Sequence, residues 1–177
     1  MMADDVPKLK KLRRLIEDGK NVMVFGPDNV ESQQVVTTYI QQLQDRNQKV
    51  AVVNICAEWK ALDFANSMSL SIFKELEKEV MDRPTNLTFQ SIIEDTLYWA
   101  DCQCEGKQMV VVFLEFHHVH GMPGGRVDAF LRSVMQRLSN ISFVFMSSQK
   151  EALSRMFILK SQPMYGMAST VDLPHFQ

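Results

Sequence analysis

Apolar residues along the chain follow two spacings in turn, which predicts strands separated by helices. Short, continuous apolar runs are typical of strands buried on both faces of a sheet. Strands of this kind are predicted at residues 21–25, 50–55, 109–114 and 141–146, with a final extended piece at 170–173. The run at 109–114, Met-Val-Val-Val-Phe-Leu, is the most apolar of them and predicts the central strand of a sheet.

Between these runs, apolar residues recur every three or four positions, as on the buried face of a helix. Such stripes predict helices near the start of the chain (Leu9 to Ile16), around 35–43, from Ala61 to before Pro84, from about Thr88 to Cys102, from Val127 to Leu138 and from Glu151 to Phe157. Strands that alternate with helices favour right-handed βαβ crossovers. The pattern therefore predicts an α/β fold with a mainly parallel sheet of about five strands.

Length and composition narrow the class of protein. A chain of 177 residues is long enough for one ordinary domain and short for two, so we expect a single domain over residues 1–177. The formal net charge of −2 provides no overall field that would attract a nucleic acid or a membrane. A basic cluster from Lys8 to Arg14 lies on an amphipathic segment that packing explains, so nucleic acid is the less favoured partner.

The first residues and the cysteines indicate a cytoplasmic protein. Residues 1–20 are charged where a signal peptide needs an apolar segment, and no apolar run reaches the roughly 18 residues of a membrane span. The three cysteines are an odd number, and Cys102 and Cys104 are too close for an unstrained disulfide. We therefore expect reduced thiols in a reducing compartment, and no membrane partner.

Five segments carry a family resemblance in the correct order. Asn21–Pro27 resembles the first strand and the opening of the phosphate loop of archaeal-type ATPases, and Ala61–Phe64 resembles the segment after their second strand. Val110–Phe116 resembles their apolar strand ending in Asp-Glu-Phe, and Phe143–Ser148 resembles their strand ending in Gly-Ser. Gln162–Met167 resembles their Pro-Leu-Tyr-Gly-Arg motif. This family belongs to the AAA+/STAND branch of P-loop NTPases. The resemblance spans nearly the whole chain and implies a three-layer α/β/α sandwich, although this chain ends at Gln177, where relatives usually continue into a helical lid.

The segment that resembles the phosphate loop has lost the residues that hold a nucleotide. A working loop reads G-x-x-x-x-G-K-[ST], because backbone N–H groups and the lysine bind phosphate and the hydroxyl holds Mg²⁺. Here Gly26 is kept, but the second glycine is Glu31, the lysine is Ser32 and the hydroxyl residue is Gln33. A carboxylate about 5 Å from a phosphate charge costs on the order of 3 kcal/mol at an effective dielectric constant of about 20, or roughly two decades of affinity. We therefore expect no bound nucleotide and no other cofactor.

Asp28 and Glu31 also have the spacing of a capping box, with Asp28 as the N-cap of the following helix and Glu31 three positions later. Their carboxylates would satisfy the N–H groups and the helix dipole that a bound phosphate would otherwise satisfy. The substitutions that remove nucleotide binding thus provide a helix that caps itself.

A second group of replacements lies at the end of the run at 109–114. Leu114 takes the place of the carboxylate that supports Mg²⁺ in the family, and Glu115 stands where the resemblance places the glutamate that activates water. Met167 replaces the arginine of the Tyr-Gly-Arg motif. A general base without a metal or a phosphate cradle has nothing to activate, so no catalytic residue is expected.

Histidines after the same run provide a competing candidate site. Glu115, His117, His118 and His120 follow the predicted central strand, at the end where open α/β sheets bind their ligands. Glu115, His118 and His120 are candidate ligands for Zn²⁺, with Cys102 or Cys104 completing the set. Their spacing matches no established zinc pattern, so surface histidines in a loop are favoured and no metal is expected.

Together these features predict a non-catalytic pseudo-ATPase that acts as a macromolecule-binding or regulatory protein. The expected partner is another protein, and the resemblance suggests an AAA+/STAND-type ATPase whose surface this chain imitates. The alternative is a weak ATP-binding protein or ATPase with an altered phosphate loop, and titration with ATP distinguishes the two. The oligomeric state stays open.

Overall fold

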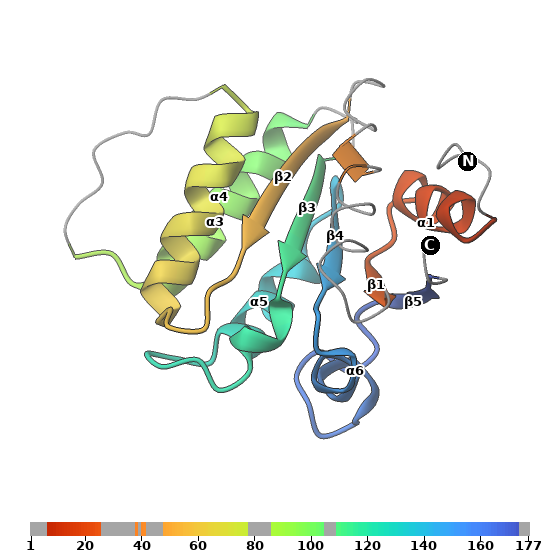
Figure 1. The fold of residues 1–177 in the computed structure, drawn as a ribbon. Helices are drawn as coiled ribbons and strands as arrows, with labels where there is room; N and C mark the ends of the chain where they lie inside the picture. The colour runs from red at the N-terminus through yellow and green to blue at the C-terminus, as the bar shows by residue number, and fades with distance from the viewer. Residues whose placement is uncertain are drawn as a thin grey trace.

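The fold is built on a five-stranded sheet with the strand order β2-β3-β4-β1-β5 (Figure 1). A computed structural model of the chain describes residues 7–25, 38, 40–41, 48–77, 86–104 and 109–173. The strands are β1 (Val22–Phe25), β2 (Lys49–Asn54), β3 (Met109–Leu114), β4 (Ile141–Met146) and β5 (Ser169–Asp172). Every pair of neighbouring strands is parallel, which confirms the predicted α/β class with a parallel sheet.

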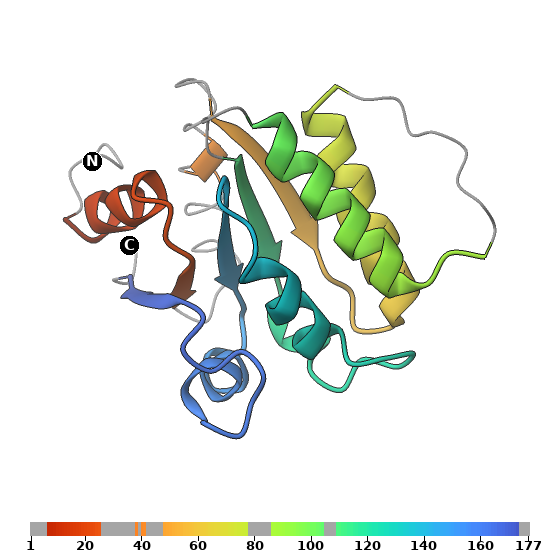
Figure 2. The ribbon, with the colours of Figure 1, turned by 180° about the vertical axis from the view of Figure 1, so that it is seen from behind.

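Helices cover both faces of this sheet. Their bounds are α1 (Pro7–Glu17), α3 (Ala61–Glu75), α4 (Phe89–Gln103), the 3₁₀ helix η3 (Phe116–Val119), α5 (Val127–Met135) and α6 (Lys150–Ile158). Figure 2 shows α3, α4 and α5 on one face, where their apolar residues and those of α6 join one core. Leu9, Leu12 and Ile16 of α1 join a second core on the other face. The three-layer arrangement expected from the sequence is therefore confirmed.

The sequence of β3 is apolar throughout because the strand is covered on both faces. Met109, Val111 and Phe113 belong to the core under α3, α4 and α5. Val110 and Val112 belong to the core under α1. Successive side chains of a strand point to opposite faces, so a strand covered on both sides needs apolar residues at every position.

The predicted elements differ from the observed ones in two places. The run at 109–114 was expected at the centre of the sheet, but β4 takes the middle position and β3 lies between β4 and β2. The helix from Ala61 was expected to reach Pro84, but α3 ends at Glu75. Glu77 has a φ of 52°, in the left-handed region, which is incompatible with a continuing helix.

Two sequence predictions lie mostly or partly outside the described residues. Of the helix predicted around 35–43, the structure describes Thr38, Ile40 and Gln41 as helical, with Ile40 buried in the core under α1. A single domain over residues 1–177 stays a prediction. Within the described ranges, no helix combines the length and the apolar character needed to cross a membrane.

The basic cluster lies on α1, where packing and ion pairs account for it. The helix buries its leucine and isoleucine stripe, and Lys8 and Lys10 are exposed on the other side. Arg13 pairs with Glu17 at 2.8 Å, and Arg14 lies 3.9 Å from Asp18. This is the solvated helix face that the sequence favoured over a nucleic-acid site.

All three cysteines are free thiols, which agrees with the expectation that Cys102 and Cys104 do not pair. Cys56 and Cys102 are exposed and Cys104 is buried. Burial, reinforced by the nearby carboxylate of Asp101, raises the pKa of the Cys104 thiol above its ordinary value. The raised pKa disfavours the nucleophilic thiolate form of Cys104. The cytoplasmic location stays a prediction.

Candidate functional site

The strand order creates a switch point between β1 and β4. The chain leaves β1 toward β2 at one edge of the sheet and leaves β4 toward β5 at the other edge (Figure 1). Where the connections of two neighbouring parallel strands diverge, the carboxyl ends of the strands border a crevice that commonly holds ligands. The residues that follow β1, β3 and β4 are therefore the candidate site.

The first group of predicted site residues follows β1. Gly26, Glu31, Ser32 and Gln33 lie outside the described residues. The assignment of these residues to phosphate-loop positions, and its consequences for nucleotide binding, therefore stay predictions.

Glu115, which follows β3, accepts two hydrogen bonds from Ser148, which follows β4. Its Oε1 accepts a hydrogen bond from the Ser148 backbone N–H at 3.0 Å, and its Oε2 accepts one from the Ser148 hydroxyl at 2.8 Å. The backbone of Glu115 is left-handed, with φ 57° and ψ 39°, where the chain turns from β3 into η3. The carboxylate thus links the carboxyl ends of two neighbouring strands.

His117 joins the same network through Ser147. Its Nδ1 lies 2.6 Å from the Ser147 hydroxyl and 3.5 Å from Oε2 of Glu115. The Ser147 hydroxyl also accepts a hydrogen bond from the Gln149 backbone N–H at 2.8 Å. Burial, and after it the neighbouring His118, lowers the pKa of His117 against the opposing effect of Glu115. The imidazole is therefore neutral at neutral pH.

Ser147, His117 and Glu115 include the residue types of a hydrolytic triad but not its geometry. In a triad the serine contacts one ring nitrogen of the histidine and the carboxylate contacts the other. Here the serine hydroxyl and the carboxylate both approach Nδ1. Ser147 is also buried, so this arrangement does not provide an exposed nucleophile.

The histidine cluster differs in membership from the one expected. The sequence grouped Glu115 with His118 and His120, whereas the structure places ligand atoms of Glu115, His117 and His118 within 4.8 Å of one another. The rings of His117 and His118 have centroids 3.9 Å apart. His120 is exposed and follows η3 with extended backbone, φ −67° and ψ 121°. His117 and His118, which were expected in a loop, therefore lie in the short 3₁₀ helix η3.

The two other predicted replacements are apolar residues that contribute to packing. Leu114, the last residue of β3, is half-buried against the core under α1. Met167 is half-buried against the larger core. An apolar side chain cannot ligate Mg²⁺ or stabilise a phosphate charge, so neither position provides the chemistry that the family resemblance would require.

A lysine lies beside the end of β1. The Nζ of Lys150, the first residue of α6, is 5.2 Å from the centroid of the Phe25 ring and 3.6 Å from Oδ1 of Asp172. Lys150 and Asp172 are both largely exposed. The positive charge of Lys150 is therefore partly balanced by a carboxylate at the end of β5.

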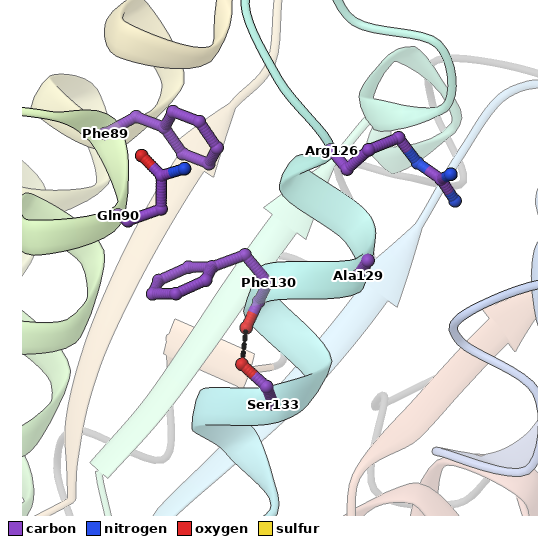
Figure 3. Close-up of a pocket in the computed structure, with 6 residues that line it drawn as sticks. All are labelled: Phe89, Gln90, Arg126, Ala129, Phe130 and Ser133. Atoms are coloured by element: carbon purple, nitrogen blue, oxygen red, sulfur yellow. Dashed lines mark hydrogen bonds between the residues drawn. The ribbon is translucent and has the colours of Figure 1, made fainter.

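A separate hollow of about 350 Å³ lies between the start of α4 and α5 (Figure 3). Phe89 and Phe130 line it in an edge-to-face pair with centroids 6.1 Å apart. Arg126 at its margin pairs with Asp128 at 3.4 Å. The hollow shares no lining residue with the Glu115 network, and the sequence predicted none of its residues as a site.

Comparison by sequence assigns no family. No family model matches the chain, and no curated protein matches it.

Comparison by structure identifies the fold. A Walker-type ATPase of Pyrococcus abyssi matches with a TM-score of 0.67 and 12% identity, covering 93% of this chain and 51% of the other. The Orc1 protein of Aeropyrum pernix, solved with DNA, matches with a TM-score of 0.64 and 14% identity over 96% of this chain and 45% of the other. The Orc2 protein of the same organism, solved with ADPNP and ADP, matches with a TM-score of 0.61 and 12% identity over 93% of this chain and 47% of the other. The chain thus has the fold of these three proteins and spans about half the length of each.

Proposed function

We propose that the chain is a non-catalytic pseudo-ATPase that acts by binding another macromolecule. The similarity to a Walker-type ATPase and to Orc proteins supports an ATPase-like fold. The observation that carries the non-catalytic part is the set of residues at the positions that the resemblance gives to the phosphate loop and the Mg²⁺ ligand, which are Glu31, Ser32, Gln33 and Leu114.

A general base needs an oxygen directed at a bound water, next to a metal and a phosphate group. Both carboxylate oxygens of Glu115 accept hydrogen bonds from Ser148, which follows β4, and this gives the carboxylate a structural role. Leu114 beside it provides no ligand for Mg²⁺, and Ser32 stands at the lysine position of the phosphate loop. Each of these features removes a different contribution to ATP hydrolysis, and they support the same proposal.

Replacing Glu115 by Gln tests whether the carboxylate acts as a general base or has a structural role. Glu115→Gln is expected to lower the free energy of unfolding by about 1–3 kcal/mol, because one Ser148 donor loses its charged acceptor. The measurement is urea unfolding, with Glu58→Gln as a matched control, since Glu58 is exposed. The ATPase rate is expected to stay at the no-protein background in all three proteins. An ATPase rate that Glu115→Gln abolishes, with stability unchanged, would support the alternative of an ATPase with an altered loop.

The partner we propose is another protein, with an AAA+/STAND-type ATPase as the candidate. Ile158, Leu159 and Tyr165, at and after the end of α6, have exposed fractions of 56%, 46% and 40%. Exposed apolar and aromatic side chains are the residues that protein interfaces bury. The near-zero net charge gives DNA no comparable attraction.

Crosslinking under native conditions checks this part of the proposal. We expect the chain to be recovered in a complex with another protein, and we expect Ile158→Asp to reduce that recovery at least about 10-fold, since a buried charge without a partner weakens an interface. Leu62→Asp on α3 is the control, because Leu62 is exposed to a similar degree, at 46%, on a different element. Recovery of free monomer alone would refute the macromolecule-binding role.

A further inference from the structure

The cluster at the start of η3 has the composition of a metal site. Glu115, His117 and His118 each place one ligand atom within 4.8 Å of the others. All three side chains are half-buried, so an ion reaching them would keep contact with solvent. The proposed function gives Glu115 a structural role and assigns no ligand to the two histidines.

We propose that Glu115, His117 and His118 bind a divalent transition metal ion of the zinc type, with water completing the coordination. Two imidazoles and one carboxylate are ligands that zinc and its neighbours prefer. Magnesium and calcium favour all-oxygen sites, so the two histidines argue against the ion that accompanies ATP. Three protein ligands leave a tetrahedral ion with an open fourth position.

Partners outside the ligand set hold two of these side chains in place. Ser148 fixes Glu115 through two hydrogen bonds, at 3.0 and 2.8 Å. A carboxylate oxygen has more than one lone pair, so these bonds are compatible with a bound cation. Nδ1 of His117 lies 2.6 Å from the Ser147 hydroxyl, and this hydrogen bond fixes the orientation of the imidazole ring. Orientation of ligands by such bonds is usual around metal sites.

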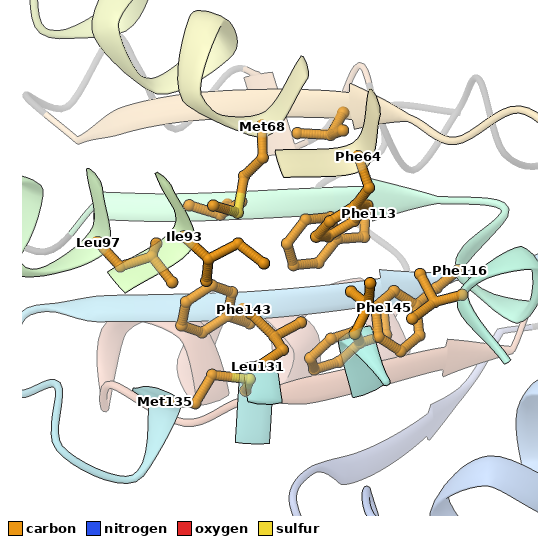
Figure 4. Packing of buried hydrophobic residues seen from close by; sticks show 14 of the residues in the cluster. Phe64, Met68, Ile93, Leu97, Phe113, Phe116, Leu131, Met135, Phe143 and Phe145 are labelled. Atoms are coloured by element: carbon orange, nitrogen blue, oxygen red, sulfur yellow. The ribbon is translucent and has the colours of Figure 1, made fainter. Parts of the chain in front are cut away.

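The backbone that carries the histidines is also held firmly. Phe116 and Val119 of η3 are 0% and 1% exposed, and Phe116 packs against Phe113 and Phe145 at 5.5 and 4.6 Å between ring centroids. Figure 4 shows Phe116 in contact with this aromatic core at the end of β3. Because the ligands are already close together, little conformational freedom is lost when an ion binds.

Titration with Zn²⁺ against a chromophoric chelator tests the site. The protein is the full chain without a histidine tag, freed of metal by dialysis. Wild type is expected to bind Zn²⁺ stoichiometrically, and its Co²⁺ form is expected to show the visible absorption of a tetrahedral site. His118→Ala is expected to weaken Zn²⁺ binding by at least about 10-fold, the lower end of losses seen even for residues that only support a metal ligand. His120→Ala is the matched control, because His120 is an exposed neighbour outside the cluster, and it should bind as wild type does.

A second readout covers the case in which a variant is less stable. Zn²⁺ is expected to raise the Tm of wild type and of His120→Ala, because a ligand that binds only the folded state stabilises it. Absence of stoichiometric Zn²⁺ binding by wild type would overturn the proposal, and so would an equal loss of affinity in His118→Ala and His120→Ala. Neither result would bear on ATP binding, so this proposal and the pseudo-ATPase proposal fail separately.

Discussion

Rebuilding the phosphate loop is expected to raise the affinity for Mg²⁺–ATP by at least about 100-fold. The variant carries Glu31→Gly, Ser32→Lys and Gln33→Thr, which restores G-x-x-x-x-G-K-T from Gly26 onward. Removing one carboxylate charge about 5 Å from a phosphate is worth on the order of 3 kcal/mol at an effective dielectric constant of about 20, and each decade of affinity is roughly 1.4 kcal/mol. The added ammonium and hydroxyl groups provide further contacts to phosphate and Mg²⁺. Isothermal titration measures the change.

A matched variant separates the effect of the lysine charge from the effect of the room that the glycine provides. Glu31→Gly with Ser32→Met and Gln33→Thr restores the glycine and the hydroxyl but has an uncharged side chain in place of the lysine. We expect this variant to bind ATP more weakly than the full rebuild by about 10-fold or more, since the lysine neutralises phosphate charge. A rebuilt loop that folds but gains no affinity would show that the residues after β1 are not a replaced phosphate loop.

Phe113→Ala is expected to lower the free energy of unfolding by about 3–5 kcal/mol, which is typical of removing a fully buried phenylalanine. Phe113 is 0% exposed, and its ring lies between 5.5 and 5.9 Å from the rings of Phe64, Phe116, Phe143 and Phe145, measured between centroids. These rings come from α3, η3 and β4, so one truncation opens a cavity among three elements (Figure 4). Urea unfolding followed by circular dichroism measures the loss.

The control for this core variant is Leu70→Ala on α3. Leu70 is 52% exposed, and its truncation is expected to change stability by less than about 0.5 kcal/mol. A loss below about 1.5 kcal/mol for Phe113→Ala would contradict the placement of this ring at the junction of the sheet, α3 and η3.

The elements of the sheet were largely predictable from sequence because burial on both faces leaves a direct signal. The runs at 109–114 and 141–146 coincide with β3 and β4. The order of the strands was not predictable in the same way, because apolar spacing reports which residues are buried and not which strand lies next to which. The early end of α3 depends on the left-handed backbone at Glu77, a position where no glycine marks the break.

The candidate site was predictable only in part. The family resemblance directed attention to Glu115, but its bonds to Ser148 depend on the pairing of β3 with β4. Spacing along the chain does not distinguish His117 from His120 as a neighbour of Glu115, whereas the 3₁₀ turn at 116–119 places His117 and His118 beside it. The consecutive serines after the run at 141–146 were a usable signal, because carboxyl ends of parallel strands meet at one edge of the sheet.

Isothermal titration of the wild-type chain with ATP in excess Mg²⁺ tests the pseudo-ATPase proposal most directly. We expect no saturable heat at micromolar ATP, while the rebuilt-loop variant in the same buffer serves as the positive control. Saturable binding of ATP by wild type in the micromolar range would contradict the proposal and favour a nucleotide-binding protein with an altered phosphate loop.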